Sequence, residues 1–123
     1  MIKLVFAIRR RVDLTAEEFH RYWRDEHGPL ARELLSGVGA RRYVQTHTIG
    51  ADINAALASS RGTEEAYDGV AEIWWDSLDH LLEVTASEDG QRANQTLAED
   101  EARFIDFERS SIFIAEEHGV IDA

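Results

Sequence analysis

The chain of 123 residues contains no cysteine and a single proline. Without cysteine it cannot form disulfides, use a thiolate nucleophile or build a cysteine-based zinc site. The absence agrees with a reducing compartment, so we expect a cytoplasmic protein. Basic residues are also few: 13 Lys and Arg stand against 24 Asp and Glu, and the formal net charge is -11. A surface this acidic repels phosphate backbones and anionic lipids, which argues against nucleic acid and membrane as partners.

Sequence motifs for cofactors and metals are missing as well. No two histidines have the helical spacing of a zinc site, no glycine-rich loop could bind a phosphate, and no nucleophile elbow is present. We therefore expect neither a metal ion nor a bound cofactor. The apolar stretch over residues 2–8 is too short to cross a bilayer, and its basic residues follow it rather than precede it as in a signal peptide.

What the chain does contain is an alternation of strand and helix signals, in a single domain over residues 1–123. Apolar and β-branched residues predict strands over 2–9, 40–49, 67–75 and 107–116. Helices are predicted between the first and second strands and between the third and fourth. The order β-α-β-β-α-β predicts an α+β, ferredoxin-like fold, in which helices cover one face of a four-stranded antiparallel sheet.

The sequence signals for the starts of the helices are clearer than the signals for their ends. A capping box at residues 15–18 begins the first helix. We expect that helix to break or kink at Gly28-Pro29, because proline lacks an amide donor and disfavours helical geometry before it. The second helix begins after Ser77 and is expected to break or bend at Asp89-Gly90. A short helix over 52–57 is expected inside the long connection between the middle strands.

The composition of the outer strands predicts a dimer. The first strand is apolar on both sides, and the last offers Phe107 and Phe113 on one side with Ile112 and Ile114 on the other. Two helices cover only one face of the sheet, and an exposed second face this apolar exceeds what monomers normally tolerate. We therefore predict a homodimer that packs two sheets face to face, as in a dimeric α+β barrel.

The first helix carries the candidate chemistry. Taken at about 100° per residue, one of its faces combines aromatic, acidic and aliphatic residues with His27 at the edge: Phe19, Tyr22, Trp23, Glu26, Leu30 and Leu34. An imidazole titrates near neutral pH, which suits His27 to general acid–base catalysis in a cleft. Tyr22 and Trp23 would supply a phenolic donor and an aromatic wall. The alternative is that His27 caps the helix end and both aromatic residues are ordinary core.

The same segment resembles the EthD-type family of dimeric α+β barrel proteins through Phe19, Tyr22-Trp23 and His27-Gly28-Pro29-Leu30. The resemblance implies a homodimer with a pocket between the sheet and the helices of each subunit. Related barrels include cofactor-free monooxygenases, muconolactone-type isomerases and polyketide dehydratases or cyclases, and the founding protein is linked to ether degradation. The family therefore defines the fold more sharply than the reaction.

Polar and aromatic residues on the middle strands extend the candidate site. Tyr43, Gln45 and His47 share one side of the second strand, and Glu72 and Trp74 share one side of the third. The pattern does not decide which side faces the helices. We keep Trp23, Tyr43, His47, Glu72 and Trp74 as substrate-binding candidates, with His27 and Tyr22 as catalytic candidates. The acidic run over 99–101 is predicted to be a solvated helix face.

These observations predict a homodimer that binds a hydrophobic small organic molecule, such as an aromatic or polyketide-like compound. If the protein is an enzyme, His27 is the expected acid–base group and Tyr22 orients a substrate oxygen. The chemistry would be isomerisation, dehydration or cyclisation by proton transfer, or a cofactor-free oxygenation in a degradative pathway. The alternatives are a non-catalytic ligand-binding accessory protein and a haem-handling relative, against which the acidic charge and the lack of an evident axial ligand argue.

Overall fold

The computed structural model describes residues 1–122. In chain order its elements are β1 (Ile2–Ile8), α1 (Ala16–Tyr22), the π-helical turn η1 (Trp23–His27), α2 (Gly28–Gly37), β2 (Arg42–His47), α3 (Asp52–Arg61), β3 (Gly69–Trp75), α4 (Leu78–Ala86), α5 (Glu88–Glu101), the 3-10 turn η2 (Phe107–Arg109) and β4 (Ser111–Glu116). The strands form one antiparallel sheet in the order β2-β3-β1-β4. The predicted α+β, ferredoxin-like architecture is confirmed.

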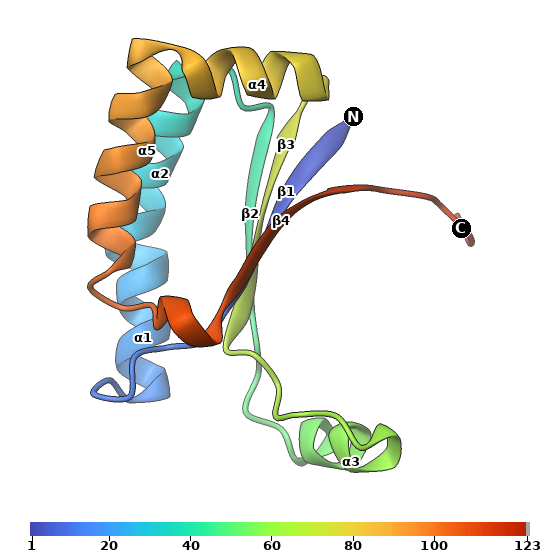
Figure 1. The fold of residues 1–123 in the computed structure, drawn as a ribbon. Helices are drawn as coiled ribbons and strands as arrows, with labels where there is room; N and C mark the ends of the chain where they lie inside the picture. The colour runs from blue at the N-terminus through green and yellow to red at the C-terminus, as the bar shows by residue number, and fades with distance from the viewer. Residues whose placement is uncertain (123) are drawn as a thin grey trace.

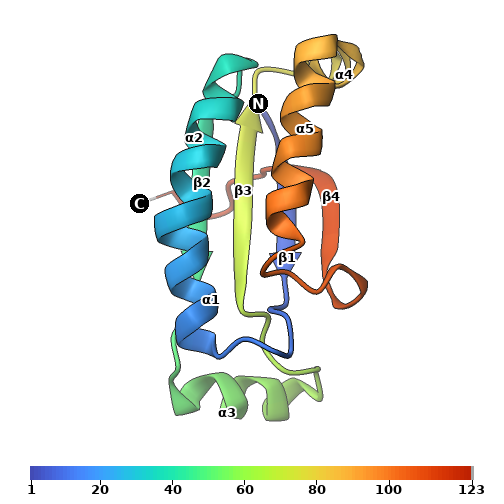
Figure 2. The same ribbon diagram turned by 90° about the vertical axis from the view of Figure 1, so that its left-hand side faces the viewer.

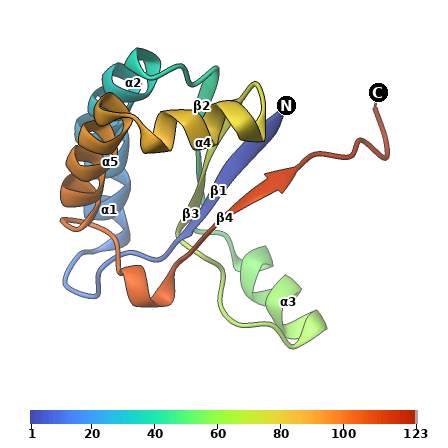
Figure 3. The same ribbon diagram turned by 45° about the horizontal axis from the view of Figure 1, so that its top comes forward.

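The helices lie in one layer against one face of the sheet. Helices α1, α2 and α5 run along that face, and α4 crosses one end of it (Figure 1). Seen from the helical side, α1 and α2 form one continuous column beside α5 (Figure 2). Helix α3 stands apart from this layer, on the side of the face that no helix covers (Figures 1 and 3). Within residues 1–122, no helix combines the length and apolar character needed to span a bilayer.

The first helix begins where the capping box predicts. The Glu18 amide donates to the Thr15 hydroxyl at 3.1 Å, and the Thr15 amide donates to the Glu18 carboxylate at 2.9 Å. These reciprocal bonds satisfy two of the amides that a helix N-terminus leaves without partners.

Of the break or kink expected at Gly28-Pro29, the break does not occur, because the chain passes from α1 to α2 through a π-helical turn. Gly28 keeps helical angles (φ -54°, ψ -52°), and its amide donates to the Trp23 carbonyl five residues back. Pro29 then falls in the first turn of α2, where a missing amide donor costs little. A π turn of this kind inserts one residue into the helix without ending it.

This inserted residue changes which side chains face the sheet. Across α1, η1 and α2 the buried positions recur every four residues, at Phe19, Trp23, His27, Ala31 and Leu35. An uninterrupted α-helix would instead have turned Glu26 and Leu30 inward and left His27 at the edge. Glu26 is exposed, and His27 is only 3% exposed.

The other boundary corrections have local causes. Helices α4 and α5 meet at Ser87, whose extended backbone (ψ 156°) ends α4 and whose hydroxyl accepts from the Gly90 amide. The break is therefore at Ser87 and not at Asp89-Gly90. Phe107 lies in η2 rather than in the last strand, and its ring stacks on Phe6, which faces the helices. Helix α3 runs beyond Leu57, to Arg61.

Two groups of buried side chains fill the space between sheet and helices. One surrounds Trp23 and comprises Phe6, Ile8, Phe19, Trp23, Ala71, Phe104 and Ile105. The other comprises Ala31, Leu35, Trp75 and Leu97. Gly69 of β3 allows the Trp23 ring to approach the sheet, since a Cβ at that position would overlap the ring. The candidate site lies where these two groups meet.

We predict that Gly90→Ala destabilises the fold by about 1–3 kcal/mol, as overpacking commonly does. A Cβ at Gly90 would overlap the backbone carbonyl of Val84, and backbone cannot move aside as a flexible side chain can. Gly37→Ala is the matched control, because a Cβ there meets nothing within 4 Å and alanine favours the helix. Urea denaturation measures both. An unchanged midpoint for Gly90→Ala would contradict the packing of α4 against α5.

Candidate functional site

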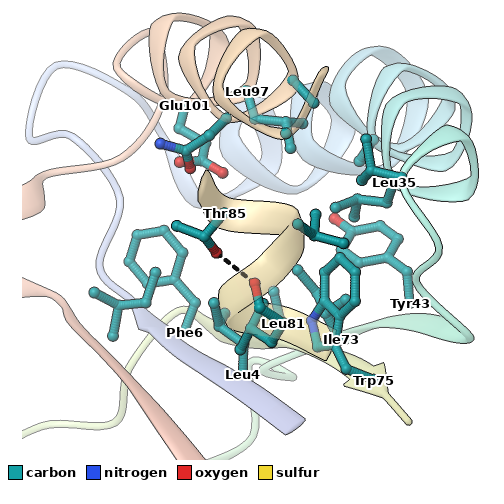
Figure 4. A pocket seen from close by; sticks show the side chains of 18 of the residues that line it. Leu4, Phe6, Leu35, Tyr43, Ile73, Trp75, Leu81, Thr85, Leu97 and Glu101 are labelled. Atoms are coloured by element: carbon teal, nitrogen blue, oxygen red, sulfur yellow. Dashed lines mark hydrogen bonds between the residues drawn. The ribbon is translucent and has the colours of Figure 1, made fainter. Parts of the chain in front are cut away.

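An apolar cavity of about 380 Å³ lies between the helical layer and the sheet. Figure 4 shows its walls, with β-strand side chains on one side and residues of α2, α4 and α5 on the others. Most of the lining is aliphatic or aromatic. The lining residues with polar side-chain atoms are Trp23, His27, Tyr43, Trp75, Thr85, Asn94 and Glu101. A mostly apolar hollow of this volume with few polar groups is typical of a site for a small organic molecule.

Asp100 of α5 organises the polar end of the cavity. Its carboxylate accepts a hydrogen bond from the Tyr22 hydroxyl at 2.6 Å and lies 2.7 Å from Nδ1 of His27. Because an ionised carboxylate only accepts, Nδ1 of His27 carries a hydrogen and Nε2 of the neutral ring is left with its lone pair. The Phe104 ring packs against both Tyr22 and His27, at 5.3 and 5.0 Å between ring centroids.

Glu101 lies beside Nε2 of His27, the ring nitrogen that does not contact Asp100. One of its carboxylate oxygens lies 3.8 Å from Nε2 of His27. Burial, and then the neighbouring charge of Asp100, raise the pKa of Glu101 to about 7. Burial lowers the pKa of His27, although the bond to Asp100 acts in the opposite direction. A carboxyl group that titrates near neutral pH therefore opens onto the apolar cavity beside a neutral imidazole.

Tyr22 contacts Asp100 and lies outside the cavity. Its side chain does not line the cavity, and burial together with the bond to Asp100 raises its pKa to about 12. The phenol therefore stays protonated at neutral pH and holds Asp100 in place. The expected role of orienting a substrate oxygen does not match this position.

The sheet register decides which strand residues reach the cavity. Tyr43 pairs with Ile73 across β2 and β3, and both line the cavity with Trp75. Glu72 and Trp74 alternate with these residues, so they lie on the opposite face, which no helix covers. The cavity is built without them.

His47 shares the helix-facing side of β2 but does not line the cavity. Its Nδ1 lies 2.7 Å from Nδ1 of His20, its Nε2 lies 2.8 Å from the side-chain oxygen of Gln45, and its ring packs at 4.2 Å from that of Trp23. Of the seven site candidates, the structure brings His27, Trp23 and Tyr43 together around one cavity.

The reading of the acidic run over 99–101 as a solvated face is wrong for Asp100 and Glu101, which are both partly buried. A signal for Glu101 was present, since Ala93, Leu97 and Glu101 follow one another at intervals of four on the inner side of α5. Asp100 gave no such signal, because its partners Tyr22 and His27 are more than seventy residues away in the chain.

Comparison with known proteins identifies the family. The profile of the EthD domain matches residues 11–108. The chain belongs to the EthD family. Among curated proteins, none matches this EthD protein.

Solved structures agree on the fold. An EthD family protein from Bacillus halodurans is 19% identical with a TM-score of 0.64, over 96% of this chain and 99% of that one. A dimeric protein of unknown function and ferredoxin-like fold from Bacteroides fragilis is 12% identical with a TM-score of 0.59, over 94% and 95%. A putative antibiotic biosynthesis monooxygenase from Deinococcus radiodurans is 13% identical with a TM-score of 0.53, over 100% and 98%.

We predict that Glu101→Gln makes the fold more stable than the wild type above pH 7. The pKa of Glu101 is raised from 4.5 to about 7, so between these values the unfolded chain ionises while the folded protein keeps its proton. Wild-type stability therefore falls as pH rises through this window, by on the order of 3 kcal/mol, and is unaffected by Glu101 below it.

Urea denaturation at several pH values measures this difference. The lowered pKa of His27 destabilises the fold only as pH falls below 6.5, so the two proteins are compared above pH 7, where the imidazole is neutral. Glu99→Gln is the control, because Glu99 is exposed on the same helix. A stability difference that stays constant from pH 4.5 to 8 would show that Glu101 is not buried as described.

Proposed function

We propose that this EthD protein is a homodimer that binds a hydrophobic small organic molecule in the cavity and transfers a proton to or from it. Glu101 is the acid–base group that meets the ligand, and His27 is its partner. One observation carries the proposal: the Glu101 carboxyl, with a pKa of about 7, opens onto the apolar cavity 3.8 Å from the neutral His27 ring.

The physical argument concerns where such a group is useful. A general acid–base group works best when its pKa lies near the working pH. Apolar surroundings strengthen its interaction with a charge that develops on the ligand. Perturbed carboxyl groups in a cleft are candidates for catalysis for this reason. Glu101 would remove a proton from a carbon next to a carbonyl group and return it at the same or another position, as isomerisation, dehydration and cyclisation require.

His27, Asp100 and Tyr22 support this step. Asp100 holds Nδ1–H of His27 so that Nε2 faces Glu101, and Tyr22 holds Asp100. His27 and Glu101 face each other at 3.8 Å, which is beyond hydrogen-bond distance, so the imidazole would act on the Glu101 carboxyl only after one of the two side chains moves closer. A cofactor-free oxygenation would begin with the same removal of a proton from the ligand.

Hydrogen–deuterium exchange tests this proposal without the natural substrate. 2-Tetralone is a bicyclic aromatic ketone whose C1 hydrogens are weakly acidic. In D₂O, the protein should accelerate deuterium incorporation at C1, measured by NMR. Glu101→Gln should lose at least about 100-fold of that acceleration, the lower end of what a general base supplies. His27→Gln should also be slower.

Glu99→Gln is the matched control, since it removes a carboxylate from the same helix outside the cavity, and its exchange rate should equal that of the wild type. Equal exchange by the wild type and Glu101→Gln would refute the assignment.

The mostly apolar lining also fits the alternative of a non-catalytic ligand-binding protein. That alternative predicts that 2-tetralone binds without any acceleration of exchange.

The uncovered face of the sheet supports the dimer. Phe113 of β4 is 49% exposed there, and Val5, Val44 and Val70 lie on the same side of their strands. Figure 1 shows that no helix packs on this face. Packing two such faces about a two-fold axis would bury the apolar side chains together with Trp74.

We predict that sedimentation of the wild type gives twice the chain mass of 13.9 kDa. Phe113→Glu should shift the protein towards the monomer, because the new charge would be buried in the interface. Val12→Glu is the control, since Val12 is 83% exposed in the loop after β1 and lies off this face. A wild-type monomer at micromolar concentration would rule out the dimer.

A further inference from the structure

The cavity is long in the direction of α5, and its acidic group lies at one end. Gly90, Ala93, Leu97 and Glu101 of this helix all line it. At about 1.5 Å per residue, the helix rises about 16 Å from Gly90 to Glu101. Glu101 ends α5, whereas α4 joins the beginning of α5 at Ser87, so α4 lies at the other end of the helix from Glu101 (Figure 1). Among the described residues that line the cavity, Glu101 is the only acidic one.

The cavity opens to the surface between α4 and β4. Four large aliphatic residues of its lining are 45–57% exposed, and we call them the apolar mouth: Leu78 and Leu82 of α4, and Ile112 and Ile114 of β4. The two isoleucines point to the helical side of the sheet, as do the residues of β1 with which they pair. Figure 2 shows why they stay exposed, since α5 lies over β1 and none of the helices lies over β4.

The apolar mouth lies on the opposite side of the sheet from the face assigned to the dimer. Ile112 and Ile114 alternate with Phe113 along β4, so a partner that packs on Phe113 leaves the mouth open. Exposed apolar side chains that gather in one place mark a contact with a ligand or with another protein. The four residues are also walls of the hollow onto which Glu101 opens. This continuity favours the outer part of a ligand as their occupant.

We propose that the substrate is an elongated carbonyl compound whose reacting carbon lies at Glu101 and whose apolar tail leaves through the apolar mouth. This proposal rests on the function proposed above and names the substrate class. The tail, an alkyl chain or a further ring, removes half-exposed aliphatic side chains from water, which is favourable in proportion to the area covered. A tail on the same side of the ligand as the reacting carbon would be directed towards Glu101 and His27 instead.

Two isomeric ketones test the direction of the tail. 6-Butyl-2-tetralone carries its chain on the side of the ring system away from C1, whereas 8-butyl-2-tetralone carries the same chain beside C1. Calorimetry measures both affinities. Complete burial of one methylene group is worth about fourfold in affinity, so a half-covered butyl chain should favour the 6-isomer by at least about 10-fold. Because the isomers are equally apolar, non-specific hydrophobic binding does not change their ratio.

Matched variants locate the chain on the protein. Leu82→Ser and Ile114→Ser should each lower the preference for the 6-isomer several-fold, because each removes apolar contact from the mouth. Leu57→Ser and Ile53→Ser should keep the wild-type ratio, since they change the same residue types at similarly exposed positions of α3, outside the cavity. Equal affinities for the two isomers, no binding of either, or a ratio that survives in the Leu82→Ser/Ile114→Ser double variant would overturn the proposal.

Sedimentation of the same variants tests the other occupant, a second copy of the chain. If a second copy covers the mouth, Leu82→Ser and Ile114→Ser will lower the sedimenting mass, and that result would also overturn the proposal. We expect their mass to equal that of the wild type, with Phe113→Glu as the comparison variant at the dimer face.

The isomers also separate this proposal from the function on which it rests. Glu101→Gln should keep the preference for the 6-isomer while it loses deuterium exchange at C1. If the preference is present but the wild type catalyses no exchange, the tail site stands and the proposed proton transfer fails. If exchange is accelerated and the two isomers bind equally well, proton transfer stands and the assignment of the apolar mouth is wrong.

Discussion

The π-helical turn over Trp23–His27 is the feature on which the site depends. By adding one residue to the helix, it aligns His27 with Trp23 and Ala31 along the face that meets the sheet. A regular α-helix would leave the imidazole at the edge of that face, away from Asp100. The turn therefore places a titratable ring in an otherwise apolar layer, and the 2.7 Å contact with Asp100 compensates for its burial.

Two adjacent carboxyl groups on α5 acquire different properties because their surroundings differ. Asp100 receives the Tyr22 hydroxyl and faces Nδ1 of His27, whereas Glu101 faces the apolar cavity and the charge of Asp100. Such a division, with one carboxylate fixed as an orienting group and its neighbour titrating near neutral pH, is a known way for a protein to assign acid–base roles. In this protein the two roles belong to adjacent residues of α5.

The two faces of the sheet differ in what covers them. The face beneath the helices forms the floor of the cavity and supplies the Tyr43 and Trp75 side chains. The other face carries Trp74, Glu72 and Phe113, which alternate with the cavity-facing residues, and no helix covers it. Membership of the EthD family describes the scaffold that these faces share, whereas the reaction must be argued from the side chains themselves.

The sequence by itself determined what depends on local pattern. Three features could be predicted from the sequence: the capping box at residues 15–18, the order of strands and helices, and the EthD-like segment around Trp23 and His27. Only the tertiary structure decided the π turn, the side of β2 that faces the helices, and the meeting of Tyr22 and His27 with Asp100. The reason is physical: hydrophobic period and capping act within a few residues, whereas register and long-range hydrogen bonds join groups whose separation along the chain leaves no local trace.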